Sequence, residues 1–137
     1  MQTTSTEKTS KASKIYCLTG SLLLLFMGLF HGSGFFYVSE AIQSSNAEAF
    51  LKDIVPVLFA HPSIHLIGLA AFGVMAVFLK HQLRKLTWLL AVLVILDALL
   101  AFFLGGMIPG LLLLAAAICF VLAGLKQQPM KAAQLDL

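Results

Sequence analysis

Residues 59–80, FAHPSIHLIGLAAFGVMAVFLK, decide the fold class of this chain. The stretch is apolar over a length that crosses a bilayer, because a transmembrane helix needs about 20 predominantly apolar residues. It also contains His61 and His65, which are one helical turn apart. Ionisable side chains inside a membrane span are costly, which makes them candidates for function. The sequence therefore predicts a membrane protein whose candidate functional groups include these two histidines.

The rest of the chain has the same apolar character. Of its 137 residues, 60% are hydrophobic and 11% are charged, whereas soluble domains have about 45–50% apolar and about 25% charged residues. The net charge of +3 is small and its carriers are scattered, which argues against binding to nucleic acid. We predict an all-α membrane protein with four transmembrane helices in an antiparallel bundle, in contact with the lipid bilayer.

The chain divides into one transmembrane domain and two polar ends. Residues 1–14 have the composition of a disordered cytoplasmic tail, residues 15–125 form the four-helix domain, and residues 126–137 form a second cytoplasmic tail. The first apolar run is longer than the 7–15 residues of a signal-peptide core, so we expect it to be retained. The spans are expected at residues 15–37, 59–80, 86–104 and 108–125.

The longest connection, between the first two spans, is polar and acidic. Ser45 and Glu48 have the spacing of a helix capping box. Apolar residues recur at helical intervals over residues 47–58, which predicts a short amphipathic helix at the membrane surface. Pro56 and Pro62 follow, so we expect a kink or a break before the second span.

The distribution of basic residues predicts the orientation. With four spans, both tails and the turn at residues 80–85 lie on one side and hold eight of the nine Lys and Arg residues, which leaves only Lys52 on the other side. The positive-inside rule makes the basic side cytoplasmic. We therefore expect a multi-pass protein of the bacterial inner membrane with both termini in the cytoplasm.

Three histidines and one aspartate fall within the spans. At 1.5 Å per residue, His31 lies about 24 Å, His65 about 21 Å and Asp97 about 16 Å from the cytoplasmic ends of their helices. His61 lies one turn beyond His65, near the outer boundary. The depths predict that the three imidazoles converge in the outer half of the bundle, with the Asp97 carboxylate one to two turns below them.

The histidines of this cluster have two interpretations, one as packing residues and one as ligands of a cofactor. In the first, the histidines hydrogen-bond Ser33, Ser63 or backbone carbonyls and specify helix packing. In the second, they bind a cofactor: haem b between His31 and His65 or His61 as axial ligands, or a transition metal held by the three histidines. Both cofactor sites would make the protein a redox component.

A further interpretation concerns Asp97. A carboxylate at this depth is expected to be neutral or paired, and the spans contain no Lys or Arg within the bilayer core to neutralise it. A histidine is the available partner. An exchange of protons between Asp97 and His65 would suit a small proton-coupled transporter.

Small residues in the first and last spans predict contacts with other helices. Gly28 and Gly32 form a GxxxG pattern, and Ala115, Cys119 and Ala123 recur every four residues. Such stripes allow helices to approach closely. They suggest other membrane proteins, or further copies of the chain, as partners.

No common catalytic motif is present, because the sequence lacks GxSxG, a P-loop, HExxH and a dinucleotide-binding fingerprint. His31-Gly32 at the end of the first span and Ser63-Ile64-His65 early in the second resemble a family of small four-helix bacterial membrane proteins. The resemblance covers mainly residues 20–75 and implies the architecture, but no reaction. We therefore expect a non-enzymatic accessory or assembly component, with the redox and transport interpretations as alternatives.

Overall fold

The computed structural model describes residues 10–79 and 82–127, and these residues contain helices and no strand. Four helical stretches in it are long and apolar enough to cross a membrane, which confirms the predicted all-helical class with four spans. The predicted tails at residues 1–14 and 126–137 lie largely outside the described residues. The helices are α1 (Lys11–Ser33), α2 (Phe35–Gln43), α3 (Ala49–Phe78), α4 (Leu83–Leu104) and α5 (Met107–Leu125).

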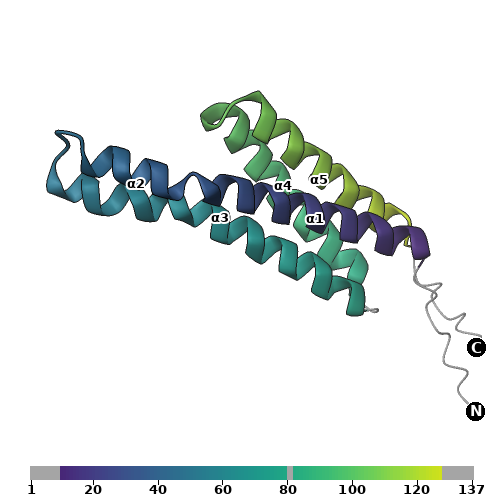
Figure 1. The fold of residues 1–137 in the computed structure, drawn as a ribbon. Coiled ribbons are helices and arrows are strands. Elements are labelled where there is room, and N and C mark those ends of the chain that lie inside the picture. The colour runs from purple at the N-terminus through teal and green to yellow at the C-terminus, as the bar shows by residue number, and fades with distance from the viewer. Residues whose placement is uncertain (1–9, 80–81, 128–137) are drawn as a thin grey trace, which may run out of the picture.

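Helix α1 is the centre of the bundle (Figure 1). It packs along both α3 and α5, while α4 packs mainly against α5 and only slightly against α3. Ser13, at the start of α1, hydrogen-bonds the carbonyl of Ala123, at the end of α5, so the start of one helix lies beside the end of the other. The order around the bundle is therefore α3, α1, α5, α4, with a sparsely packed seam between α3 and α4.

The GxxxG pattern of α1 is used inside the chain. A Cβ atom at Gly28 would lie 2.9 Å from the Ile67 side chain and 3.1 Å from the Ser63 carbonyl, and one at Gly32 would lie 3.4 Å from Ser63 Oγ. The two glycines therefore let the backbone of α1 approach α3 closely. This pairing is the ordinary packing role of such a pattern.

A second close approach joins three helices. Phe120 of α5 is fully buried, and a Cβ at Gly20 of α1 would lie 3.1 Å from its ring. On the other side of the ring, Gly73 of α3 leaves room for both Phe120 and the Ser21 hydroxyl. The ring thus fits between two glycines on neighbouring helices.

The small-residue stripe predicted on α5 is only partly in the core. Ala123 is buried, Cys119 is half-buried and Ala115 is exposed. The buried face instead includes Ala116, Ala117 and Phe120. A spacing of strictly four residues drifts around a helix of 3.6 residues per turn, which explains why Ala115 leaves the interface.

The connection between the first two spans differs from the sequence prediction. There is no separate helix at residues 47–58, because α3 begins at Ala49 and continues through Pro56 and Pro62. The predicted capping box is also absent: Glu48 is the N-cap of α3 without a side-chain bond, and the Ser45 hydroxyl donates to the carbonyl of Ile42. Ser45 thus closes the turn after α2 and does not start α3.

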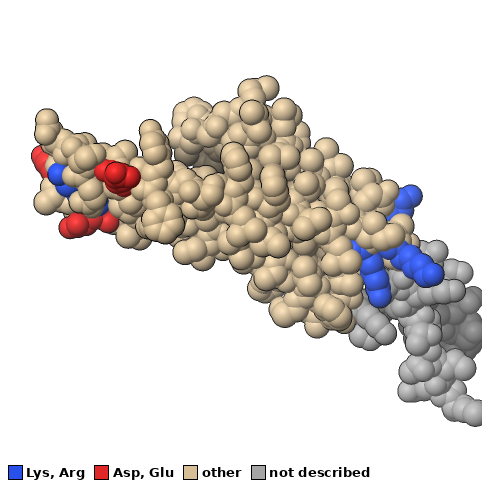
Figure 2. Space-filling view, in the orientation of Figure 1, with Lys and Arg blue, Asp and Glu red and all other residues tan. Residues whose placement is uncertain are grey.

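The two hairpins differ in length. The candidate span Lys11–Gln43 contains 33 residues and Met107–Leu125 contains 19, which corresponds to about 50 Å and about 29 Å of helix. As a result α2 and the start of α3 extend beyond the α4–α5 turn (Figure 1). Acidic side chains gather at this extended end and most of the basic ones at the opposite end (Figure 2).

Valine at Gly73 should destabilise the bundle. Its Cβ would collide with the Ser21 hydroxyl and crowd Phe120, and overpacking of a filled core costs about 1–3 kcal/mol. The matched control is Gly68→Val on the same helix, where a Cβ meets nothing within 4 Å. Unfolding of the purified protein in mixed micelles should show a loss for Gly73→Val and little change for Gly68→Val; equal losses would contradict the described packing.

Candidate functional site

His31 lies in the interface between α1 and α3. Its Nδ1 atom is 2.9 Å from the hydroxyl oxygen of Ser63, which is itself buried. The imidazole also stacks on the ring of Phe59, with 4.4 Å between centroids and 22° between the planes. Both contacts join the end of α1 to the outer part of α3. This is the role that the packing interpretation assigns to the histidines, with Ser63 as the partner.

His65 and Asp97 meet across the seam between α3 and α4. His65 Nε2 is 3.3 Å from Asp97 Oδ2, while 40% of the histidine side chain and 21% of the aspartate side chain are exposed. Oδ2 is buried beneath the histidine and makes no well-aligned hydrogen bond to any described residue. The pair is therefore close enough for electrostatic attraction, but the carboxylate still has capacity to accept a hydrogen bond.

His61 extends this polar site along α3. Its ring stacks on that of His65, with 6.3 Å between centroids and 7° between the planes, and its side chain is exposed. Residues four apart lie on the same face of a helix, one turn from each other. We refer to His61, His65 and Asp97 as the polar stripe.

The predicted convergence of three imidazoles is wrong. His31 contacts Ser63, whereas His65 contacts Asp97. Ser63 and His65 are two residues apart on α3, which is a rotation of about 200° around the helix axis. The depths of His31 and His65 are similar, but the two side chains lie on opposite sides of α3.

This arrangement does not fit the predicted cofactors. No group of three His, Cys, Asp or Glu side chains within the described ranges is placed to hold a metal ion. An axial pair for haem b would need His31 to face His65 or His61, but helix α3 lies between them. The His31 ring also already contacts the Ser63 hydroxyl and the Phe59 ring. The stripe suits polar contacts or proton exchange better than ligation.

A group of polar side chains at the basic end forms contacts that were not predicted from the sequence. The Ser13 hydroxyl donates to the Ala123 carbonyl at 2.7 Å and accepts from Gln127 Nε2 at 3.1 Å. The Cys17 thiol donates to the Gly73 carbonyl at 3.2 Å. A spacing of four residues places Ser13, Cys17 and Ser21 on one face of α1. That spacing was the available signal, but Ser13 was assigned to a tail.

Comparisons with protein-family models, with curated proteins and with solved structures found no match. The function therefore has to be argued from the geometry of the chain. Of the two polar sites that contain histidines, the His31–Ser63 pair is part-buried between α1 and α3, whereas the polar stripe opens on the outside of the bundle.

We expect His31 and Ser63 to be coupled energetically. Interhelical hydrogen bonds in membranes contribute about 0.6–2 kcal/mol, so a double-mutant cycle of His31→Ala and Ser63→Ala should give a coupling energy in that range. Unfolding in mixed micelles measures it. A cycle of His31→Ala with Ser44→Ala, an exposed serine beyond α2, is the control and should be additive. Additivity in both cycles would contradict the described contact.

Proposed function

We propose that this chain is a non-enzymatic accessory or assembly component of a membrane, and that it acts as an oligomer whose copies meet at the polar stripe. One observation carries the proposal: within an apolar span, the Asp97 side chain is 21% exposed beside a His65 side chain that is 40% exposed, so both polar groups reach the outside of the bundle. Lipid tails cannot supply a donor, whereas another helix can.

The proposed setting is an antiparallel bundle in the bacterial inner membrane, with the basic end and both termini in the cytoplasm. The separation of charge in Figure 2 supports it, since the acidic side chains gather at one end of the molecule and most of the basic ones lie at the other. In this setting α2 and the start of α3 lie in the outer headgroup region. Their exposed aromatic rings suit an amphipathic segment at that level.

The α3–α4 seam is the natural interface because α3 and α4 pack against each other much less than α1 packs against α3 or α4 packs against α5. Polar side chains inside membranes usually face protein or water and seldom lipid. Here the stripe is flanked by exposed leucines of α4, including Leu96 and Leu100. A helix laid along the seam would cover the polar stripe and gain apolar contacts beside it.

A second copy has the chemistry that the stripe needs. The stripe offers imidazole nitrogens as donors and a carboxylate as acceptor on one face. Two copies related by an axis normal to the membrane bring groups of similar depth together. His65 of one copy can then approach Asp97 of the other, because the two residues differ in depth by about one helical turn. The face is therefore complementary to itself.

Removal of the carboxylate should weaken association. Interhelical polar contacts contribute about 1–2 kcal/mol in model peptides, so Asp97→Leu should raise the dissociation constant about fivefold or more. Energy transfer between labelled copies in proteoliposomes, measured over a range of protein-to-lipid ratios, gives this constant. Leu111→Ala, an exposed position on α5, is the control. A wild-type chain that is monomeric at every ratio would contradict the proposal.

Proton-coupled transport is a second candidate, and the contact between His65 and Asp97 favours it. Stacked His61 and His65 form a series of titratable groups that leads from the outer part of α3 to the carboxylate. Below Asp97, the buried face of α4 continues with apolar Val94 and Leu90. The series therefore stops near the middle of the membrane, which is why we place transport second.

If the stripe moves protons, both of its inner members are needed. Proteoliposomes with a trapped pH-sensitive dye should show a flux driven by a pH gradient, and Asp97→Asn or His65→Ala should abolish it. His31→Ala is the control, because His31 lies on the other side of α3, and it should keep the flux. An absence of flux with the wild-type chain would leave assembly as the sole candidate function.

A further inference from the structure

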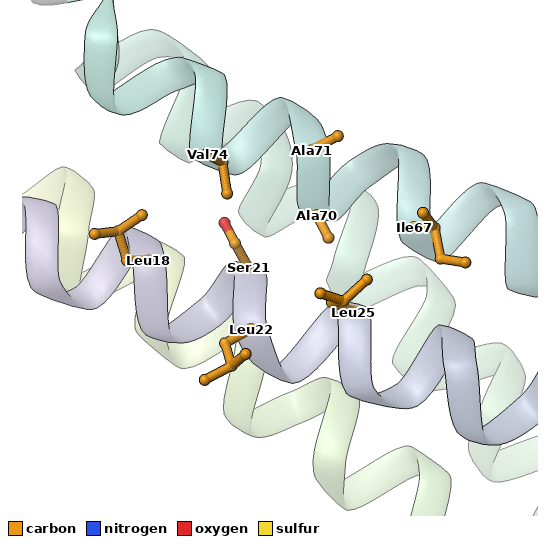
Figure 3. A pocket seen from close by; sticks show the side chains of 8 residues that line it. All are labelled: Leu18, Ser21, Leu22, Leu25, Ile67, Ala70, Ala71 and Val74. Carbon is orange, nitrogen blue, oxygen red and sulfur yellow. The ribbon is translucent and has the colours of Figure 1, made fainter.

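A groove runs along the outside of the bundle between α1 and α3 (Figure 3). It has a volume of about 440 Å³ and is open on one side. Its walls are almost entirely aliphatic. The lining residues are Leu18, Ser21, Leu22 and Leu25 of α1, and Ile67, Ala70, Ala71 and Val74 of α3.

The lining of the groove favours an apolar ligand. Its single polar side chain, Ser21, is 2% exposed, and its hydroxyl donates to the carbonyl of Cys17 at 2.9 Å. The small side chains of Ala70 and Ala71 line the groove on α3, and in Figure 3 the Leu22 side chain points away from α3. Every hydrogen-bonding group at its surface is satisfied, so a hydrocarbon chain can fill it without loss.

Two lysines lie at one end of this groove. On a helix with about 100° per residue, Lys11 and Lys14 lie within about 40° of Leu18 around the axis of α1. Lys14 precedes Leu18 by one turn and Lys11 precedes it by two. The sequence Lys11, Lys14, Leu18, Leu22 and Leu25 therefore forms one continuous face that is cationic at the end of the bundle and aliphatic farther along.

The groove also has the depth of a single leaflet. From Ile15, where the apolar part of α1 begins, Leu18 lies about 5 Å and Leu25 about 15 Å along the helix. Half of the hydrocarbon layer is about 15 Å thick. A lipid chain in the groove thus carries its headgroup to the level of the two lysines.

We infer that this groove binds one acyl chain of an anionic phospholipid from the leaflet at the basic end, and that Lys11 and Lys14 contact the headgroup phosphate. The charge around the site favours an anion, since the acidic residues of the described chain lie in the middle or at the opposite end. The site is independent of self-association. Ile67 and Val74 point away from the face of α3 that carries His61 and His65, because their positions differ by about half a turn.

Native mass spectrometry of the chain, released from nanodiscs with equal amounts of phosphatidylglycerol and phosphatidylethanolamine of matched acyl chains, tests the inference. The wild-type chain should retain phosphatidylglycerol preferentially. The double variant Lys11→Gln/Lys14→Gln should lose this preference by about fivefold for each lysine, from the known attraction of a basic residue to an anionic lipid surface. Ala71→Phe should reduce the retention of both lipids, because the ring fills the groove.

Two matched variants serve as controls. Lys126→Gln removes a lysine at the same end of the bundle, and Ala115→Phe adds a ring at an exposed position of α5. Both should behave as the wild type does, and circular dichroism should show the same helical content for all variants. Retention by Ala71→Phe equal to that by Ala115→Phe would overturn the groove. An unchanged preference in the double lysine variant would overturn the role of the lysines.

Discussion

The close approach of α1 to its two neighbours is the constraint on which the rest of this structure depends. Lipid tails are as apolar as leucine, so the hydrophobic effect does not hold membrane helices together, and packing has to do so. Gly20 and Gly28 on α1, with Gly73 on α3, bring backbones and rings into contact. Because α1 lies between α3 and α5, these contacts join both hairpins.

The same interfaces satisfy most of the polar groups. Ser13, Cys17 and Ser21 bond carbonyl oxygens on α5, α3 and α1, and His31 bonds Ser63. The serines and Cys17 are buried where α1 meets a neighbour, and His31 is part-buried there. The polar stripe is different because it lies where α3 and α4 scarcely touch. The Asp97 side chain keeps 21% of its surface exposed there, and this exposed polar surface is what the proposed partner would cover.

Much of this arrangement follows from elementary properties of the sequence. The length and hydropathy of the four apolar runs predicted the spans, since about 20 apolar residues cross a bilayer. The rise per residue of a helix predicted similar depths for His31 and His65. A carboxylate inside a membrane needs a partner, and this predicted that Asp97 pairs with a histidine. The depth of a residue depends only on its position along the helix axis, and the contact of His65 with Asp97 agrees with the predicted depths of these two residues.

Rotation about the helix axis was harder to predict. The faces on which α1 and α3 meet are marked by Gly28 and Gly32 on α1 and by Gly73 on α3, and a glycine has no side chain whose polarity marks a face. Once Ser63 faces α1, His65 must face away, so the three imidazoles separate. The prediction of a separate surface helix at residues 47–58 was wrong for another reason. The stretch is helical, but it packs against α2 and continues into the rest of α3.

The unequal hairpins have a mechanical consequence. A bilayer with a hydrocarbon layer of about 30 Å matches α4 and α5, whereas α1 and α2 together are longer, with Phe36 and Tyr37 exposed beyond the level of the α4–α5 turn. Such a molecule meets a different hydrophobic thickness on each flank. Covering α2 with hydrocarbon would require the lipids on the α1–α3 flank to stretch or the protein to tilt, so the placement of α2 at the headgroup level depends on the local thickness of the membrane.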